Sequence, residues 1–377
     1  MSLTSPVLVA ILALLVVISV AASVWIWPRL ANTRVVTVLG RLGLLIVVNV
    51  CVLLLSFALL NDQFQFFSDW TDLMGTASTQ VTSSQAGGAA SLAAQVPVAS
   101  PTSAVATATA TAVSSAGNGT VYSVTGGQSG VTSNVLVYLP KGYADPANAT
   151  RRYPVLIGFG GYPSTVYQLA NGFRISGTLE ALTGRGALGP VIAVFVQPWT
   201  PAGRDTECVN GGGGAGDQVE TWAAVDVPAW LTVHFRAVTA RSGWATWGMS
   251  AGGWCAAMTA MLHPDRFAAA ISLGGYFRPS WGNWQPFHAG DPRLHRYDLV
   301  ALAGSSPPPV ALWVFTSKPD GLGYPSTTAL MAAAHPPLSV TAQVAASGGH
   351  RFSTWQPWLP VALTWLGRNV SGFAPKP

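Results

Sequence analysis

A serine between two glycines is the first feature of the sequence that could do chemistry. Gly248-Met249-Ser250-Ala251-Gly252 matches G-x-S-x-G, in which a sharp strand-to-helix turn presents the serine hydroxyl as a nucleophile. Glycine supplies 40 of the 377 residues, so the pattern alone is a weak signal. Its setting is stronger, because the apolar run WATW precedes it and the helix-like run AGGWCAAMTAML follows it. We predict that Ser250 is a nucleophile and that both glycines are needed to avoid a clash in the turn.

A nucleophilic serine needs a base, and the base needs an acid to orient it. After a turn of this kind the acid and then the histidine come later in the chain, each on a loop that follows a strand. Asp320 follows the apolar run ALWVFT, and His350 follows a run ending in QVAAS on a Ser-Gly-Gly loop. Such loops lie at the carboxyl ends of strands, where ligands bind in open α/β sheets. The sequence therefore predicts a triad of Ser250, His350 and Asp320.

Other acids and histidines are poorer candidates for the triad. His263 and His335 precede prolines at predicted helix ends, where a capping role is the better interpretation, and His234 falls inside a predicted helix. Four more titratable residues come before the strand that should deliver the acid: His288, Asp291, His295 and Asp298.

Acyl transfer from an ester also needs donors for the developing oxyanion. One should be the backbone N–H of Ala251, directly after the nucleophile. The second should come from a loop after an early strand, and Phe159-Gly160-Gly161-Tyr162-Pro163 fits this place, with the N–H of Tyr162 as the donor. The alternative for this loop is an ordinary glycine turn.

Short apolar runs that alternate with helix-like segments must position these residues. The runs predict strands over 135–139, 154–159, 191–196, 245–247, 268–273, 311–316 and 339–344. Several are apolar on both faces, which is typical of strands buried in a parallel sheet. Helices are predicted over 217–236, 251–263, 326–334 and 355–369. This alternation predicts an α/β fold, a three-layer sandwich with a mainly parallel sheet, over residues 120–374.

The N-terminal 65 residues have a different character. Uncharged stretches over about 6–27 and 42–60 are long enough to cross a bilayer, and the first lacks the basic start of a cleaved signal peptide. Arg29, Arg34 and Arg41 lie between them or at their inner edge, whereas Asp62 is the first charge after the second. The positive-inside rule then puts the connecting loop in the cytoplasm and both termini outside. We expect a multi-pass, two-helix hairpin in the cell membrane with the catalytic domain outside the cytoplasm.

Residues 66–119 contain a juxtamembrane stretch and then a tract of Ala, Ser, Thr, Gly and Val. Such a tract has few large apolar side chains to bury, so we expect a flexible linker.

The predicted domain resembles the esterase family that includes esterase D (S-formylglutathione hydrolase), feruloyl esterases and the antigen 85 mycolyltransferases of actinobacteria. The resemblance covers about 120–367 and rests on YPV before the Gly-Gly loop, on GMSAGG, on HPDRFAAAISLGGYF and on GGHRFSTW. It implies an α/β-hydrolase fold, a triad of Ser250, His350 and an acid, and no cofactor. The hairpin, linker and esterase domain together are similar to actinobacterial membrane-anchored envelope esterases.

The resemblance also limits the reactions that we expect of this protein. It implies a serine esterase that acts on a small-molecule or glycolipid ester, or an acyltransferase that moves the acyl group to a sugar of the cell envelope. Mycolyltransferases have Glu as the acid, whereas this chain has Asp320, so mycolate transfer is not carried over. An inactive domain that binds envelope polymer is the alternative from another class.

Two of the three cysteines, Cys208 and Cys255, lie in the predicted α/β domain. We predict that Cys208 and Cys255 form a disulfide that pins a loop beside the active site, with free thiols as the alternative. The three Cys and six His show no metal-ligand spacing.

The net charge is +5, but the sequence contains no Lys/Arg-rich run, which disfavours nucleic acid as a partner. The oligomeric state stays open. Five tryptophans near the predicted site loops either line a substrate groove or pack in the core: Trp199, Trp254, Trp281, Trp284 and Trp355.

Overall fold

In this computed structural model the chain divides into two compact units. The structure describes residues 3, 5–64, 66–67, 69–76, 80–95, 107–116, 118–200, 203–212, 217–288 and 290–375. One unit comprises residues 1–80 with the loops 318–321 and 346–351, and the other comprises 81–317, 322–345 and 352–377.

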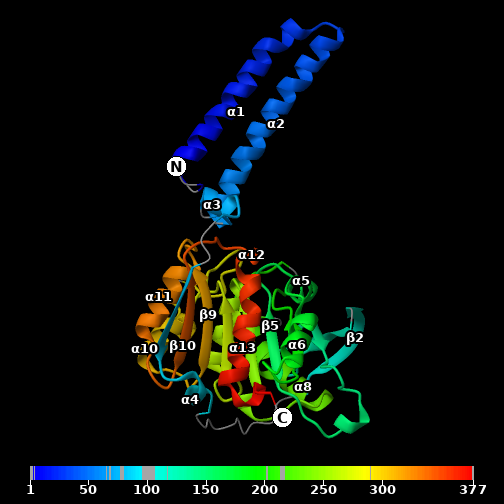
Figure 1. Cartoon of the computed structure of the whole chain (residues 1–377), viewed down its shortest axis with the longest axis vertical. Coiled ribbons are helices and arrows are strands. Elements are labelled where there is room, and N and C mark those ends of the chain that lie inside the picture. Colours follow the sequence, from blue (N-terminus) through cyan, green and yellow to red (C-terminus); the bar gives the residue numbers. More distant parts are fainter. Residues whose placement is uncertain are drawn as a thin grey trace. The chain divides into compact units, whose positions relative to one another are not determined.

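The first unit contains a hairpin of two long helices (Figure 1), α1 (Pro6–Ile26) and α2 (Val35–Phe64), joined by η1 (Trp27–Leu30). The segments Pro6–Leu30 and Val35–Asp62 are long and apolar enough to cross a membrane. Helix α2 begins earlier than the predicted 42, so Arg41 lies inside the helix and not at its edge. A short helix, α3 (Trp70–Leu73), follows.

A ten-stranded sheet forms the centre of the second unit (Figure 1). Its spatial order is β1-β10-β9-β8-β7-β5-β6-β4-β3-β2; the run from β10 to β6 is parallel, and β1, β4, β3 and β2 are added antiparallel. The strands are β1 (Val81–Gly87), β2 (Thr109–Ala116), β3 (Gly119–Thr125), β4 (Thr132–Tyr138), β5 (Val155–Phe159), β6 (Ile192–Val196), β7 (Trp244–Met249), β8 (Ala269–Leu273), β9 (Ala311–Ser317) and β10 (Ser339–Ala345). Every predicted strand is present, and the α/β class is confirmed.

Helices cover both faces of the sheet. Within β5, Val155 and Ile157 belong to one hydrophobic core and Leu156 to the other, as the alternation of side chains along a strand requires. Helices that pack on the first face are α8 (Val227–His234), α9 (Ala251–Leu262), α10 (Leu299–Ser305) and α11 (Gly323–Ala333). Those on the second face are α4 (Ala90–Gln95), α5 (Val166–Gly172), α6 (Ile175–Gly184) and α13 (Leu359–Asn369). The shorter helical turns are α7 (Val219–Thr221), α12 (Phe352–Trp355), η2 (Pro146–Asn148), η3 (Trp222–Asp226), η4 (Arg241–Gly243), η5 (Pro292–Tyr297), η6 (Gln356–Trp358) and η7 (Ser371–Phe373).

The expected linker over 66–119 is wrong for part of its length. Strand β1 pairs with β10, and β2 pairs with β3, so residues 81–87 and 109–116 are edge strands of the sheet. Helix α4, also within the expected linker, buries Ala90, Ala93 and Ala94. Backbone hydrogen bonds to an existing sheet need no bulky side chains, which is why an Ala/Ser/Thr tract can be ordered there. Residues 68, 77–79, 96–106 and 117 of the expected linker lie outside the described residues.

Candidate active site

Ser250 lies at a tight turn between β7 and α9, as the motif predicts. Its backbone has φ 54° and ψ −127°, a conformation that non-glycine residues rarely adopt and that is typical of functional turns. A Cβ on Gly248 would lie 2.1 Å from the carbonyl oxygen of Gly252, and a Cβ on Gly252 would lie 2.2 Å from that of Phe159. Both glycines are therefore required by the close approach of backbone to backbone.

The two predicted oxyanion donors, the N–H groups of Ala251 and Tyr162, belong to segments that adjoin Ser250. Ala251 is the first residue of α9, so its N–H is one of those that a helix leaves without an intrahelical acceptor. The loop after β5 lies against the nucleophile, because a Cβ on Gly161 would be 3.2 Å from the Cβ of Ser250. The hydroxyl of Ser164 donates to the Gly161 carbonyl at 2.6 Å and holds the loop, while the hydroxyl of Tyr162 donates to the Gly203 carbonyl at 2.6 Å.

The predicted acid and base are paired. Nδ1 of His350 lies 3.0 Å from Oδ2 and 3.1 Å from Oδ1 of Asp320. The Asp320 side chain is 1% exposed and that of His350 is 15% exposed. A buried carboxylate on Nδ1 orients an imidazole and leaves Nε2 for proton transfer.

Each of the three predicted triad residues follows a strand in the parallel part of the sheet. Ser250 follows β7, Asp320 follows β9 by three residues and His350 follows β10 by five. Strands β7, β8, β9 and β10 are consecutive and parallel, so their carboxyl ends meet at one edge of the sheet. The approach of His350 to Ser250 itself stays a prediction.

The predicted disulfide is confirmed. Cys208 and Cys255 are bonded, with 5.7 Å between their Cα atoms, and both are fully buried. The bond fastens the loop before Cys208 to the nucleophile helix α9. The indole N–H of Trp254 strengthens the attachment by donating to the Glu207 carbonyl at 2.8 Å.

Two acids on this loop are buried, and their raised pKa values make them functional candidates. Burial raises the pKa of Glu207 to about 8, even though its carboxyl accepts a 2.5 Å hydrogen bond from Tyr276. Burial likewise raises the pKa of Asp205 to about 6. The spacing D-x-E before a cysteine carried no signal of burial, because burial depends on the packing of the loop against α9.

Three of the poorer triad candidates have structural roles: His263, Asp291 and Asp298. His263 pairs with buried Glu220 at 2.8 Å, and Arg296 and Tyr297 also donate to this carboxylate. Burial alone would raise the pKa of Glu220, but the hydrogen bonds outweigh it and lower the pKa to about 2. Asp291 and Asp298 accept hydrogen bonds from backbone N–H groups at the starts of η5 and α10.

All five tryptophans pack in or against the two hydrophobic cores. Trp199, Trp254 and Trp355 are buried and pack in the cores, whereas Trp281 and Trp284 are partly exposed. Among the residues that the structure describes, no group of three or more His, Cys, Asp or Glu could hold a metal ion.

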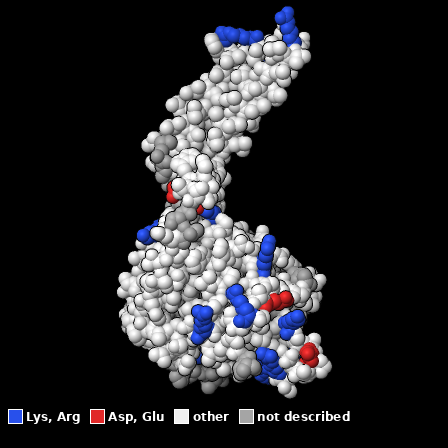
Figure 2. Space-filling view, in the orientation of Figure 1, with Lys and Arg blue, Asp and Glu red and all other residues white. Residues whose placement is uncertain are grey.

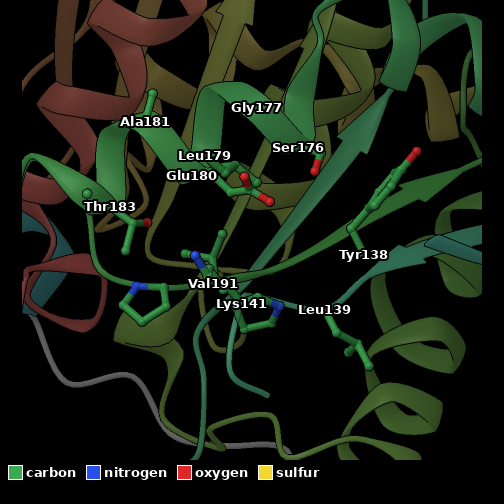
Figure 3. A pocket seen from close by; sticks show the side chains of 13 residues that line it. Tyr138, Leu139, Lys141, Ser176, Gly177, Leu179, Glu180, Ala181, Thr183 and Val191 are labelled. Carbon is green, nitrogen blue, oxygen red and sulfur yellow. The ribbon is translucent and has the colours of Figure 1, made fainter. Parts of the chain in front are cut away.

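Cavities on this unit include two of more than 400 Å³. One of about 430 Å³ borders the oxyanion loop at Pro163, and its other lining residues include Asn134, Thr165, Gln197 and Trp199. The second, about 520 Å³, lies between α6 and the end of β4 (Figure 3), where Lys141 and Glu180 point toward the same space. Its wall includes Val191, just before β6, so it is at the amino ends of the parallel strands, opposite the edge that carries Ser250.

Comparisons with known proteins identify the family and the fold of this chain. Residues 128–366 match the family described as "Putative esterase". The MPT51 antigen of Mycobacterium leprae is 32% identical over 149 residues, which cover 37% of this chain and 46% of the antigen. The diacylglycerol acyltransferase/mycolyltransferase Ag85B of Mycolicibacterium smegmatis is 43% identical over 68 residues, 18% of this chain and 20% of Ag85B. The chain thus spans less than half the length of either curated relative.

Solved structures share the fold. A ferulic acid esterase superposes with a TM-score of 0.54 at 19% identity and covers 70% of this chain and 98% of its own. An S-formylglutathione hydrolase from Agrobacterium tumefaciens gives 0.56 at 16% identity, with 69% and 99% covered. Because the family match takes in more than half of the residues, including the serine elbow, the chain belongs to the putative esterase family.

Proposed function

We propose that this protein is a membrane-anchored serine esterase whose catalytic domain lies outside the cytoplasm and which forms an acyl-enzyme on Ser250. The observation that carries the proposal is the strained turn at Ser250, with glycines wherever a Cβ would collide. Strain of this kind persists where the surrounding structure imposes it, commonly at active sites.

The chemistry follows from the roles of the groups. His350 takes the proton of the Ser250 hydroxyl while its Oγ attacks the ester carbonyl, and the N–H groups of Ala251 and Tyr162 stabilise the oxyanion. His350 then gives the proton to the leaving alkoxide, and the acyl group stays on Ser250. Water, deprotonated by His350, attacks the acyl-enzyme. His350 then returns this proton to the Oγ of Ser250 as the acid is released. Asp320 holds the imidazole and stabilises its protonated form.

The membrane part of the proposal rests on the hairpin. Figure 2 shows Lys and Arg side chains gathered at its turn, where the sequence places Arg29 and Arg34. Basic residues at the connecting turn favour a cytoplasmic position for the turn, and hence an exterior position for the chain beyond α2. The Cys208–Cys255 disulfide supports an exterior position for the catalytic domain, because disulfides persist in oxidising compartments.

Transfer of the acyl group to a cell-envelope sugar is a second candidate. The 430 Å³ cavity beside the oxyanion loop is lined by uncharged residues, many with hydroxyl or amide groups, which suits a neutral polyhydroxylated acceptor. One curated relative carries the name of an acyltransferase, which also supports this candidate.

The test uses the full chain in detergent, with p-nitrophenyl esters and a fluorophosphonate probe. Wild-type protein should hydrolyse the ester and take up one probe per chain, and Ser250→Ala should do neither. Ser305→Ala, at an exposed serine on α10, is the matched control and should behave as wild type. Addition of trehalose or another sugar separates the two candidates, since transfer gives an acylated sugar. If the wild-type chain neither turns over ester nor takes up probe, an inactive envelope-binding domain replaces both.

A further inference from the structure

The loop that carries His350 is fastened at both ends by the juxtamembrane segment, by which we mean the described residues of 66–80 that follow α2. At its start, the N–H of Ala346 donates to the carbonyl of Gln80 at 2.9 Å. At its end, Arg351 forms an ion pair with Asp72, a residue of α3. The loop itself contains consecutive glycines, and Gly348 has φ +100°, so little in its own sequence restricts it.

The contact of Arg351 with Asp72 has a well-defined geometry. Nη1 donates to Oδ2 at 2.6 Å and Nη2 donates to Oδ1 at 2.5 Å, a two-point pairing that fixes the guanidinium plane. Nη1 also donates to the carbonyl of Phe66, and the guanidinium lies 4.5 Å from the centre of the Phe67 ring. The side chains of Arg351 and Asp72 are 19% and 3% exposed, so solvent screens the pair only weakly.

The same segment is tied to the last turns of α2. The side-chain amide of Asn61 donates to the carbonyl of Phe67 at 3.0 Å and accepts from its N–H at 2.7 Å. Asn61 is 1% exposed, and the ring of Phe57 lies 6.0 Å from that of Phe67. A continuous set of contacts therefore leads from α2 through Phe67 to Arg351, which is covalently joined to His350.

We propose that Asp72 is a positioning residue: through Arg351 it holds the loop of His350 in its working orientation, so that the segment after the membrane helices takes part in catalysis. This inference rests on the proposed function. Its physical basis is the steep dependence of proton transfer on geometry, since a displacement of about 1 Å can cost about 100-fold in rate. The His350–Asp320 pair lies in the same compact unit as Asp72, so a loss of the ion pair should reach it directly.

The experiment compares three substitutions in the full chain in detergent. Asp72→Asn keeps the size of the side chain and removes its charge; Asp72→Glu restores the charge. Asp62→Asn makes the same chemical change at an exposed acid at the end of α2 and is the matched control. We expect Asp72→Asn to lower kcat by about 10- to 100-fold with KM within about twofold, Asp72→Glu to recover most of the loss, and Asp62→Asn to match wild type.

A fluorophosphonate probe separates positioning from misfolding. The final amount of probe per chain counts folded sites, and the labelling rate reports how well the base is placed. Asp72→Asn should label to the wild-type amount at a rate reduced in proportion to kcat. The inference is overturned if Asp72→Asn keeps the wild-type kcat, or if its labelled amount falls while the rate of the remaining fraction is normal. In either case a loss of activity in Ser250→Ala leaves the proposed function standing.

Discussion

His350 and Asp320 face each other across 3.0 Å, from Nδ1 to Oδ2, although thirty residues separate them in the chain. The carboxyl is almost fully buried, so its charge acts on the imidazole with little screening by water. The two loops that hold them follow neighbouring parallel strands, β9 and β10.

Substitution of the acid tests this pairing. Asp320→Asn should lower kcat for p-nitrophenyl ester hydrolysis by about 10³- to 10⁴-fold, because an amide can hold the wrong tautomer of the imidazole and cannot stabilise its charged form. Asp298→Asn is the control, since Asn can still cap α10. An activity loss in Asp298→Asn with a normal rate in Asp320→Asn would mean that the acid is misassigned.

Gly161→Ala tests the oxyanion loop. The new methyl group would lie 3.2 Å from the Cβ of Ser250 and 3.3 Å from the carbonyl oxygen of Met249, so the loop must move away from the nucleophile. We expect kcat to fall by about 100-fold with a small change in KM. Gly177→Ala has open space around it in α6 and should leave kcat unchanged. Equal kinetics for the two variants would argue against a role for this loop.

Removal of the disulfide tests stability. The double substitution of Cys208 and Cys255 by Ala should lower the free energy of unfolding by roughly 2–4 kcal/mol, because the bond closes a long loop in the unfolded chain. Urea unfolding followed by tryptophan fluorescence, without reductant, measures the change. Cys51→Ala, in α2, should leave the urea midpoint of the esterase domain where it is. A double variant with the wild-type midpoint contradicts the prediction.

Glu207→Gln tests the buried acid on the disulfide loop. Burial raises the pKa of Glu207 from 4.5 to about 8 in the folded protein, so the folded state keeps a proton that the unfolded chain releases. The contribution of this group to the free energy of unfolding is therefore fully present below pH 4.5 and falls as the pH rises to about 8.

The uncharged Gln lacks this dependence, and its carbonyl oxygen can still accept from Tyr276. The melting temperature of Glu207→Gln should thus rise relative to wild type between about pH 5 and 8. Glu180→Gln, the same substitution at an exposed site, is the matched control. If the Glu207→Gln difference from wild type is constant with pH, the carboxyl does not titrate as described.

The local sequence was sufficient to predict the strands at the centre of the sheet. Strands such as β5 and β6 are apolar on both faces, a pattern that arises only where helices cover both sides. The turn at Ser250 could also be predicted, because its two glycines express a local steric need. The order of Ser250, Asp320 and His350 followed from the requirement that each come after a strand.

Other features were decided by tertiary structure. Strands β1 and β2 have weak hydrophobic patterns of their own and are ordered by hydrogen bonds to neighbouring strands. Strand β1 pairs with β10, which lies far away in the chain, and β2 pairs with β3 on the other side of a turn. The buried state of Glu207 and the contact of Arg351 with Asp72 likewise depend on which loops meet. A sequence determines local preferences directly, whereas long-range contacts depend on the packing of the whole chain. For that reason Asp320 could be predicted from its place after a strand, but the burial of Glu207 and the pairing of Asp72 could not.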